Sequence, residues 1–160
     1  MQKLKILVVL NVISVLFSCQ TDQNRETDLT QAFSFRKDTL LKFVKDMDTL
    51  PITFEIELAQ SDYQKETGLM HRKQMKIDQG MLFIYEDQRK RQTFYMKNTF
   101  IPLDLIYLNS EMEIVDFNLK TKPLSEDYIS SGIPSMYVLE VNAGLVERLQ
   151  LEKGDFVILN

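Results

Sequence analysis

Ile52-Thr53-Phe54-Glu55-Ile56-Glu57-Leu58 alternates apolar and polar side chains without a break. Successive side chains of a strand point to opposite faces, so this alternation is typical of a half-buried β-strand. Pro51 stands directly before the stretch, at a position where a strand can begin. The stretch therefore predicts a half-buried strand over residues 52–58.

Shorter runs of the same kind occur on both sides of this stretch. We expect further strands at residues 38–44, 81–85, 93–96, 103–108, 113–117, 136–141 and 156–159. The run 93–96 is expected to pair back with 81–85, because the polar residues 86–91 between them suit a solvated turn.

Two short helices interrupt the strands. Ser61 and Gln64 have the spacing of a capping box, which predicts a helix that ends before Gly68. Asn142 can cap a second helix over residues 143–149. About eight short strands without long crossover helices favour antiparallel pairing. We predict a mainly β fold, α+β at the margin, as a small antiparallel β-sandwich or barrel with two short helices.

The amino-terminal segment predicts the cellular location of the protein. Residues 1–18 have a basic start at Lys3 and Lys5 and then a short apolar run, the order of a signal peptide. Cys19, the one cysteine of the 160 residues, follows directly and resembles the bacterial lipoprotein box. The apolar run is shorter than the roughly 20 residues that span a bilayer, which disfavours an uncleaved anchor. The polar residues after it disfavour a buried core segment.

This pattern divides the chain into three parts. We predict a signal peptide at 1–18, a lipidated tether at 19–36 and a single β-rich domain at 37–160. Gln20 is not the aspartate that retains lipoproteins at the inner membrane in the enterobacterial sorting rule. We therefore expect a lipid-anchored protein of the cell envelope, at the outer membrane or facing the periplasm in a Gram-negative host.

The net charge of the chain limits the classes of partner that it is expected to bind. The chain carries −4, and loss of the two signal-peptide lysines leaves about −6. This balance disfavours nucleic acid as a partner. We expect contact with the membrane through the lipid on Cys19, and contact with an unknown envelope ligand or protein.

Three motifs contain the residues most able to bind or react. They are Gly68-Leu69-Met70-His71-Arg72, Gly80-Met81-Leu82-Phe83 and Tyr95-Met96-Lys97-Asn98-Thr99-Phe100-Ile101-Pro102-Leu103-Asp104. In this order they resemble the domain-of-unknown-function family 192, also called uncharacterised protein family 0127. The likeness continues through 137–141 to Gly154-Asp155. The resemblance implies a compact, mainly β domain and brings no established activity. Tyr95 stands where the family usually has Trp.

The motifs supply a candidate ligand-binding site. Its members are Arg72, Tyr95, Lys97, Asn98, Thr99 and Asp104. The two cations suit an anion, whereas the ring with the amide and the carboxylate suits a sugar. The same residues could equally form a hydrogen-bonded network that fixes an irregular crossover between strands.

Two other functions stay open beside a non-catalytic binding module. A hydrolase acting on an envelope polymer would use Asp104 with Glu140 or Asp116, because glycoside hydrolysis needs two carboxylates. A copper carrier would use the thioethers that lie close together in the sequence, with His71 beside them. These are Met70, Met75, Met81 and Met96. Methionines more often fill core gaps. We expect no catalytic residue, no metal and no cofactor.

Overall fold

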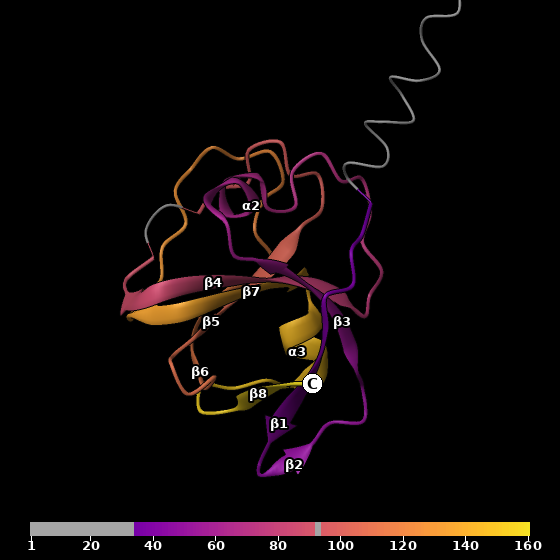
Figure 1. Cartoon of the computed structure of the whole chain (residues 1–160), viewed down its shortest axis with the longest axis vertical. Coiled ribbons are helices and arrows are strands. Elements are labelled where there is room, and N and C mark those ends of the chain that lie inside the picture. The colour runs from indigo at the N-terminus through magenta and orange to yellow at the C-terminus, as the bar shows by residue number, and fades with distance from the viewer. Residues whose placement is uncertain (1–33, 92–93) are drawn as a thin grey trace, which may run out of the picture. The chain divides into compact units, whose positions relative to one another are not determined.

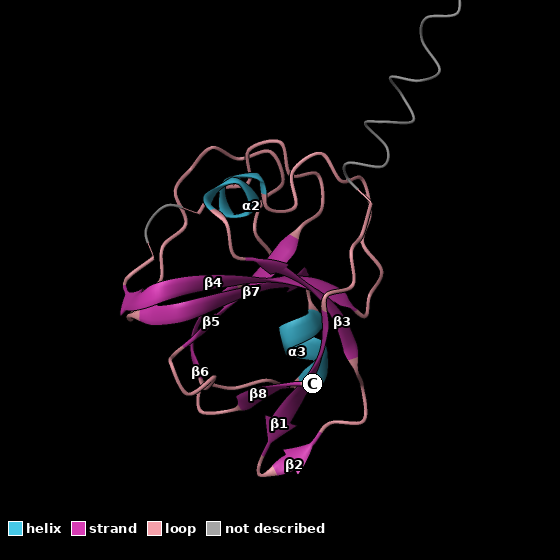
Figure 2. Ribbon diagram, viewed as in Figure 1, coloured by secondary structure: helices cyan, strands magenta, loops and turns pink. Residues whose placement is uncertain are grey.

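In the computed structural model, residues 34–91 and 94–160 are described. They form eight strands and two helices (Figures 1 and 2). In chain order these are β1 (Thr39–Lys45), β2 (Asp48–Thr49), β3 (Phe54–Ala59), α2 (Asp62–Thr67), β4 (Gln79–Arg89), β5 (Leu103–Leu108), β6 (Ile114–Asn118), β7 (Ser135–Asn142), α3 (Leu145–Leu149) and β8 (Phe156–Leu159). The predicted mainly β fold is confirmed.

The strands form one curled sheet. Its order is β2-β1-β3-β4-β7-β5-β6, and β8 pairs with β1. Among the described strands only the pair β3–β4 is parallel, and the other pairs are antiparallel. Near β6, the N–H of Ile114 donates to the carbonyl of Asp155 at 2.8 Å, and the N–H of Val157 donates to that of Met112 at 3.0 Å. These bonds connect the far end of the sheet to β8, so the sheet curls into an incomplete barrel.

Two local predictions are wrong. Of the strand expected at 93–96, the described residues 94–96 do not pair back with β4, because β7 occupies that edge, and Phe94 instead forms an isolated bridge with Ile129. Asn142 does not cap α3, whose N-cap is Gly144. The side-chain amide of Asn142 donates instead to the carbonyl of Lys76 at 2.8 Å.

Apolar residues pack on both faces of the β4–β7–β5 layer. The inner core lies within the curl and includes Leu82, Ile106 and Leu139, with Leu145 of α3. The outer core lies on the other face and includes Phe83, Leu105, Tyr107 and Val138. Figure 1 shows α3 inside the curl and α2 with its neighbouring loops above the opposite face. Alternation along each strand therefore supplies two cores from one sheet.

The helix α2 begins and ends as expected. The Ser61 hydroxyl accepts from the Gln64 N–H, and Oε1 of Gln64 accepts from the Ser61 N–H at 3.0 Å. Gly68 follows with φ +49°, and a Cβ there would lie 3.1 Å from Cζ of Phe83. A glycine thus lets the chain leave the helix close to the outer core.

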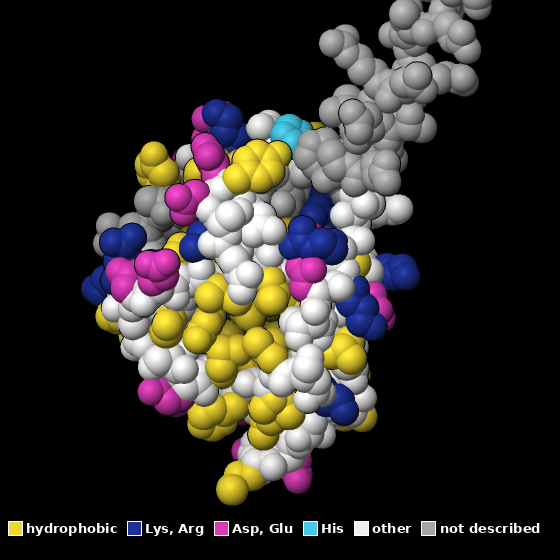
Figure 3. Space-filling model, in the orientation of Figure 1, with side chains coloured by type: hydrophobic (Ala, Val, Ile, Leu, Met, Phe, Trp, Pro, Cys, Tyr) yellow, Lys and Arg dark blue, Asp and Glu magenta, His cyan; other side chains and the backbone are white. Residues whose placement is uncertain are grey.

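Hydrophobic side chains gather on one face of the domain, over the opening of the curl (Figure 3). None of the helices in residues 34–91 and 94–160 has the length and apolar character needed to cross a membrane. The predicted signal peptide and Cys19 lie outside the described residues.

Candidate functional site: a pocket around Glu140

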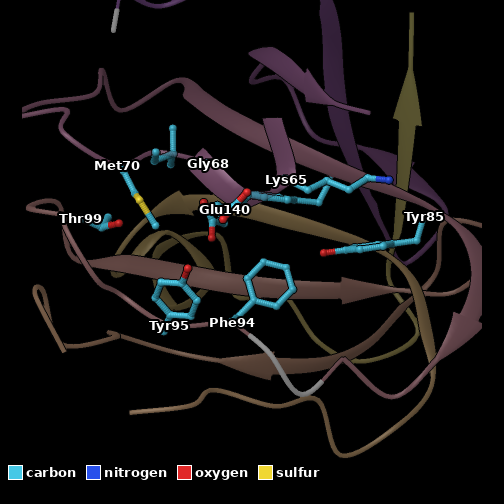
Figure 4. Close-up of a pocket in the computed structure, with 11 residues that line it drawn as sticks. Lys65, Gly68, Met70, Tyr85, Phe94, Tyr95, Thr99 and Glu140 are labelled. Atoms are coloured by element: carbon cyan, nitrogen blue, oxygen red, sulfur yellow. The ribbon is translucent and has the colours of Figure 1, made fainter. Parts of the chain in front are cut away.

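A pocket of about 290 Å³ opens above the outer core (Figure 4). It lies between α2, the loop after α2, the strands β4 and β7, and the loop that precedes β5. Its lining residues are Lys65, Glu66, Gly68, Leu69, Met70, Phe83, Tyr85, Phe94, Tyr95, Thr99 and Glu140. Its size is at the lower end for small-molecule sites, which range from about 300 to 1,000 Å³.

Strand register places two carboxyls in one row across the outer face. Glu57 on β3 is the partner of Met81 on β4, and Met81 is the partner of Glu140 on β7. Directly paired residues share a face, so Glu57 and Glu140 lie two strands apart, about 10 Å between Cα atoms. Gly80 permits this close pairing, because a Cβ there would lie 2.7 Å from the carbonyl oxygen of Glu140.

Glu140 borders the pocket without a partner for its charge. The residue is 6% exposed. Within residues 34–91 and 94–160 its carboxyl forms no hydrogen bond or ion pair. Burial raises the pKa of Glu140 to about 8, and the charge of Arg72 opposes this rise. The carboxyl is therefore mostly protonated at neutral pH and able to donate a hydrogen bond.

Arg72 is committed to Glu57. Both terminal nitrogens of its guanidinium donate to the two oxygens of Glu57, with Nη2 to Oε2 at 2.8 Å. The Arg36 N–H donates to the same carboxylate at 3.1 Å. The Nε of Arg72 is buried without a hydrogen-bond partner. This bidentate ion pair neutralises the charge of Glu57. It leaves the carboxyl of Glu140 without a paired cation.

Aromatic rings form much of the pocket wall. Phe83 and Phe94 meet edge to face with centroids 5.2 Å apart. The Tyr85 ring has Nζ of Lys65 at 5.0 Å and the guanidinium carbon of Arg91 at 3.7 Å from its centroid. Burial raises the pKa of Tyr85 to about 12, so its hydroxyl stays protonated. The wall thus combines flat apolar surfaces with hydroxyl donors.

In the Tyr95–Asp104 motif, buried Met96 anchors the loop to the protein. The Met96 N–H donates to the carbonyl of Ser125 at 2.9 Å, and its sulfur accepts from the Thr121 hydroxyl at 3.2 Å. This anchor turns Tyr95 and Thr99 toward the pocket, which both line. Figure 4 shows Tyr95 below Glu140 and Thr99 to one side.

Lys97 and Asn98 lie away from the pocket at the exposed tip of this loop. Nζ of Lys97 is 3.9 Å from Glu126. Asn98 has φ +55°, and its carbonyl accepts the N–H of His71 at 2.8 Å. This bond connects the loop to the Gly68–Arg72 motif. Asn98 thus positions the loops around the pocket through its backbone.

Asp104 lies on the opposite face of the sheet. It pairs with Val141 in register, whereas Glu140 pairs with Leu105. Its carboxylate accepts the N–H of Lys120 at 2.9 Å, of Gly144 at 2.9 Å and of Val146 at 3.1 Å. It therefore supplies the acceptor that Gly144 lacks at the start of α3. The six candidate residues do not form one site. Tyr95 and Thr99 line the pocket, and Arg72 lies at its border, paired with Glu57.

One of the carboxylate pairs considered for hydrolysis is separated by the sheet. Asp104 and Glu140 face opposite sides of the sheet. Asp116 is held by Nζ of Lys153 at 2.7 Å and by the N–H of Gly132 at 2.7 Å.

The four methionines lie in different environments. Met81 and Met96 are 5% and 2% exposed in the outer core, Met75 packs against that core, and Met70 lines the pocket. Residues 34–91 and 94–160 contain no group of three or more His, Cys, Asp or Glu that could hold a metal. Met81 and Met96 thus fill the core.

Sequence reasoning missed Glu57 and Lys65 and considered Glu140 only as a hydrolytic acid. Glu57 looked like the solvent-facing half of a regular alternation. A signal was present: two polar positions, Glu55 and Glu57, flank buried Ile56, and the nearby motif ends in an arginine that can pair with one of them.

The fold and the pocket define a small curled-sheet domain with a ligand-sized cavity on its outer face. The chain belongs to the DUF192 family, described as an uncharacterised ancient conserved region, whose model matches residues 42–159. No curated protein matches it.

Two solved structures are similar. One, a candidate transcription regulator from Sinorhizobium meliloti 1021, is 38% identical with a TM-score of 0.70, covering 76% of this chain and 92% of that one. The other, a protein of unknown function from Novosphingobium aromaticivorans DSM 12444, is 29% identical with a TM-score of 0.67, covering 74% of this chain and 83% of that one.

Proposed function

We propose that the protein is a lipid-anchored binding module of the cell envelope, and that its pocket takes up a small ligand against Glu140. The sequence pattern through Cys19 supports the anchor. The observation that carries the binding role is the Glu140 carboxyl, which is buried at the pocket and makes no bond within the described protein. A polar group left in this way is costly unless a ligand or water satisfies it.

A hydrolase is the second candidate, because one observation favours it. A buried carboxyl with a pKa of about 8 has the property of a general acid. The second carboxyl would have to come from Glu66, the other acid that lines the pocket. Glu66 is exposed on α2. Binding remains the first proposal, since it requires only Glu140.

The anchor is tested by labelling cells with an alkyne analogue of palmitate. The wild-type chain is expected to incorporate the label and to sediment with membranes. The Cys19→Ser variant is expected to lose both properties. A wild-type chain that carries no label would refute the anchor and leave the pocket proposal standing.

The pocket is tested by extracting the full chain natively from its own envelope and analysing released small molecules by mass spectrometry. Wild type and Lys97→Ala are expected to carry the same compound, because Lys97 lies at the loop tip. Glu140→Gln is expected to carry much less of it. If wild type and Glu140→Gln return identical profiles, Glu140 does not bind a ligand. If wild type converts the compound on incubation and Glu140→Gln does not, the hydrolase replaces the binding module.

A further inference from the structure

Charge balance around the pocket leaves one positive charge missing. Three charged groups meet on the outer face: the carboxyls of Glu57 and Glu140, and the guanidinium of Arg72. Both terminal nitrogens of Arg72 are taken by Glu57. One cation cannot neutralise two carboxylates in a low-dielectric site. Glu140 must therefore hold its own proton or meet a second cation.

Lys65 does not supply that cation. It lines the pocket, but its ammonium lies 5.0 Å from the centroid of the Tyr85 ring. Figure 4 shows the Lys65 side chain extending toward Tyr85, with its nitrogen pointing away from Glu140. The position opposite the carboxyl is therefore not occupied by a lysine.

The groups around Glu140 suit an organic cation. In Figure 4 the Tyr95 ring, the Phe94 ring and the Met70 sulfur surround the carboxyl of Glu140. Phe83 and Tyr85 also line the cavity. Ring faces attract cations, and rings together with a thioether pack well against methyl or methylene groups. A strongly hydrated inorganic ion would gain little from such a wall.

We infer that the pocket binds a compact organic ammonium, whose positive charge pairs with Glu140 and whose carbon atoms pack against Phe94, Tyr95 and Met70. This inference rests on the proposed binding role of the pocket and names the class of its ligand. The ammonium takes the place of the proton that Glu140 holds when the pocket is empty. Binding therefore releases one proton, which leaves the carboxyl oxygen for solvent.

The proton release fixes the direction in which the affinity changes with pH, and this direction can be measured. Below pH 8 the affinity for a permanently charged ammonium rises about tenfold for each pH unit, and above it the affinity levels off. A neutral ligand held by the protonated carboxyl would bind more weakly as the pH rises. The charged or titratable groups near Glu140 are Glu57 on β3, Lys65 and Glu66 on α2, Arg72 in the following loop, Tyr85 on β4, Tyr95 in the loop before β5 and Tyr107 on β5.

The test compares two molecules of nearly identical shape. Choline carries a quaternary nitrogen where 3,3-dimethylbutan-1-ol carries a carbon. Each is titrated between pH 6 and 9 into the mature chain with Cys19→Ser, and the amide NMR shifts of Met70, Thr99 and Glu140 report binding. We expect choline to bind at least about tenfold more tightly than the alcohol at pH 8, since charge pairing is worth 1.4 kcal/mol or more.

Two variants locate the effect. Glu140→Gln is expected to bring the affinity for choline down to that for the alcohol, whereas Glu86→Gln, at an exposed acid of β4 outside the pocket lining, preserves the preference. Equal binding of both probes by the wild type, or choline binding that weakens with rising pH, would overturn the inference while the pocket remains a binding site. If neither probe moves these amides, the inference fails whether or not the envelope extraction returned a ligand.

Discussion

Replacing Glu140 by glutamine should make the protein more stable at high pH. An ordinary glutamate in the unfolded chain ionises near pH 4.5, whereas burial raises the pKa of Glu140 to about 8 in the folded protein. The folded state thus binds more protons than the unfolded state between these two values. The stability of the wild type is complete below pH 4.5 and falls as the pH rises through the window, until the folded carboxyl also ionises.

The size of the effect follows from the two pKa values. A rise from 4.5 to about 8 corresponds to about 5 kcal/mol of unfolding free energy in full. Between pH 5 and pH 9 the wild type should lose about 4 kcal/mol through this group alone. Since an ordinary domain is stable by only about 5–15 kcal/mol, this loss is large. Glutamine has the same shape and does not titrate, so Glu140→Gln should not show it.

The assay is urea unfolding of the mature chain with Cys19→Ser, followed by circular dichroism at pH 5, 7 and 9. The stability difference between Glu140→Gln and the parent should grow by about 4 kcal/mol across that range in favour of glutamine. Glu66→Gln, at an exposed acid of the same pocket, should show no such growth. Parallel curves for parent and Glu140→Gln would refute the conclusion that Glu140 is buried without a partner.

Four further substitutions, one of them a control, test contacts on both faces of the sheet. Arg72→Ala should cost about 3–5 kcal/mol in urea unfolding, because Glu57 is left charged and buried; a loss below 1 kcal/mol would contradict the buried pair. Gly80→Ala should cost about 1–3 kcal/mol, since its Cβ meets the Glu140 carbonyl at 2.7 Å, and an unchanged midpoint would mean that β4 and β7 are not so close. Asp104→Ala should cost about 2–4 kcal/mol through the loss of three hydrogen bonds to its carboxylate, while exposed Lys97→Ala should cost under about 0.5 kcal/mol. Equal losses from those last two would contradict the cap.

Local patterns predicted most of the fold for a physical reason. The strand expected at 52–58 and the Ser61–Gln64 capping box depend on residues that are neighbours in sequence; a strand is present over Phe54–Ala59, and the capping box is present as predicted. The pairing expected for residues 94–96 failed because it depends on a strand that is far away in the sequence. Phe94 bridges to Ile129, and which strand takes the edge of β4 is decided by β7, more than forty residues along the chain. Local periodicity carries no information about such competition.

The site was predictable in part, for a related reason. Tyr95 and Thr99 were found because an irregular loop with polar residues stands out among strands. Asp104 was found with them, but its side is fixed by strand register, which the sequence alone did not reveal. Glu57 was missed because a buried charge and a solvent-facing charge occupy the same place in an alternating strand.

The residues that the fold requires can be separated from those that it does not require. Asp104 is needed to cap α3, Gly80 lets β4 approach β7, and Arg72 neutralises Glu57. Each of these motif residues has a structural task within the domain. Glu140 has none: an apolar residue in its place would remove a cost of several kcal/mol at neutral pH and above. Strongly shifted pKa values cluster at functional sites, and the raised pKa of Glu140 at a cavity makes it a candidate for one. Among the residues of the described domain, Glu140 is therefore the one whose presence is best explained by a ligand.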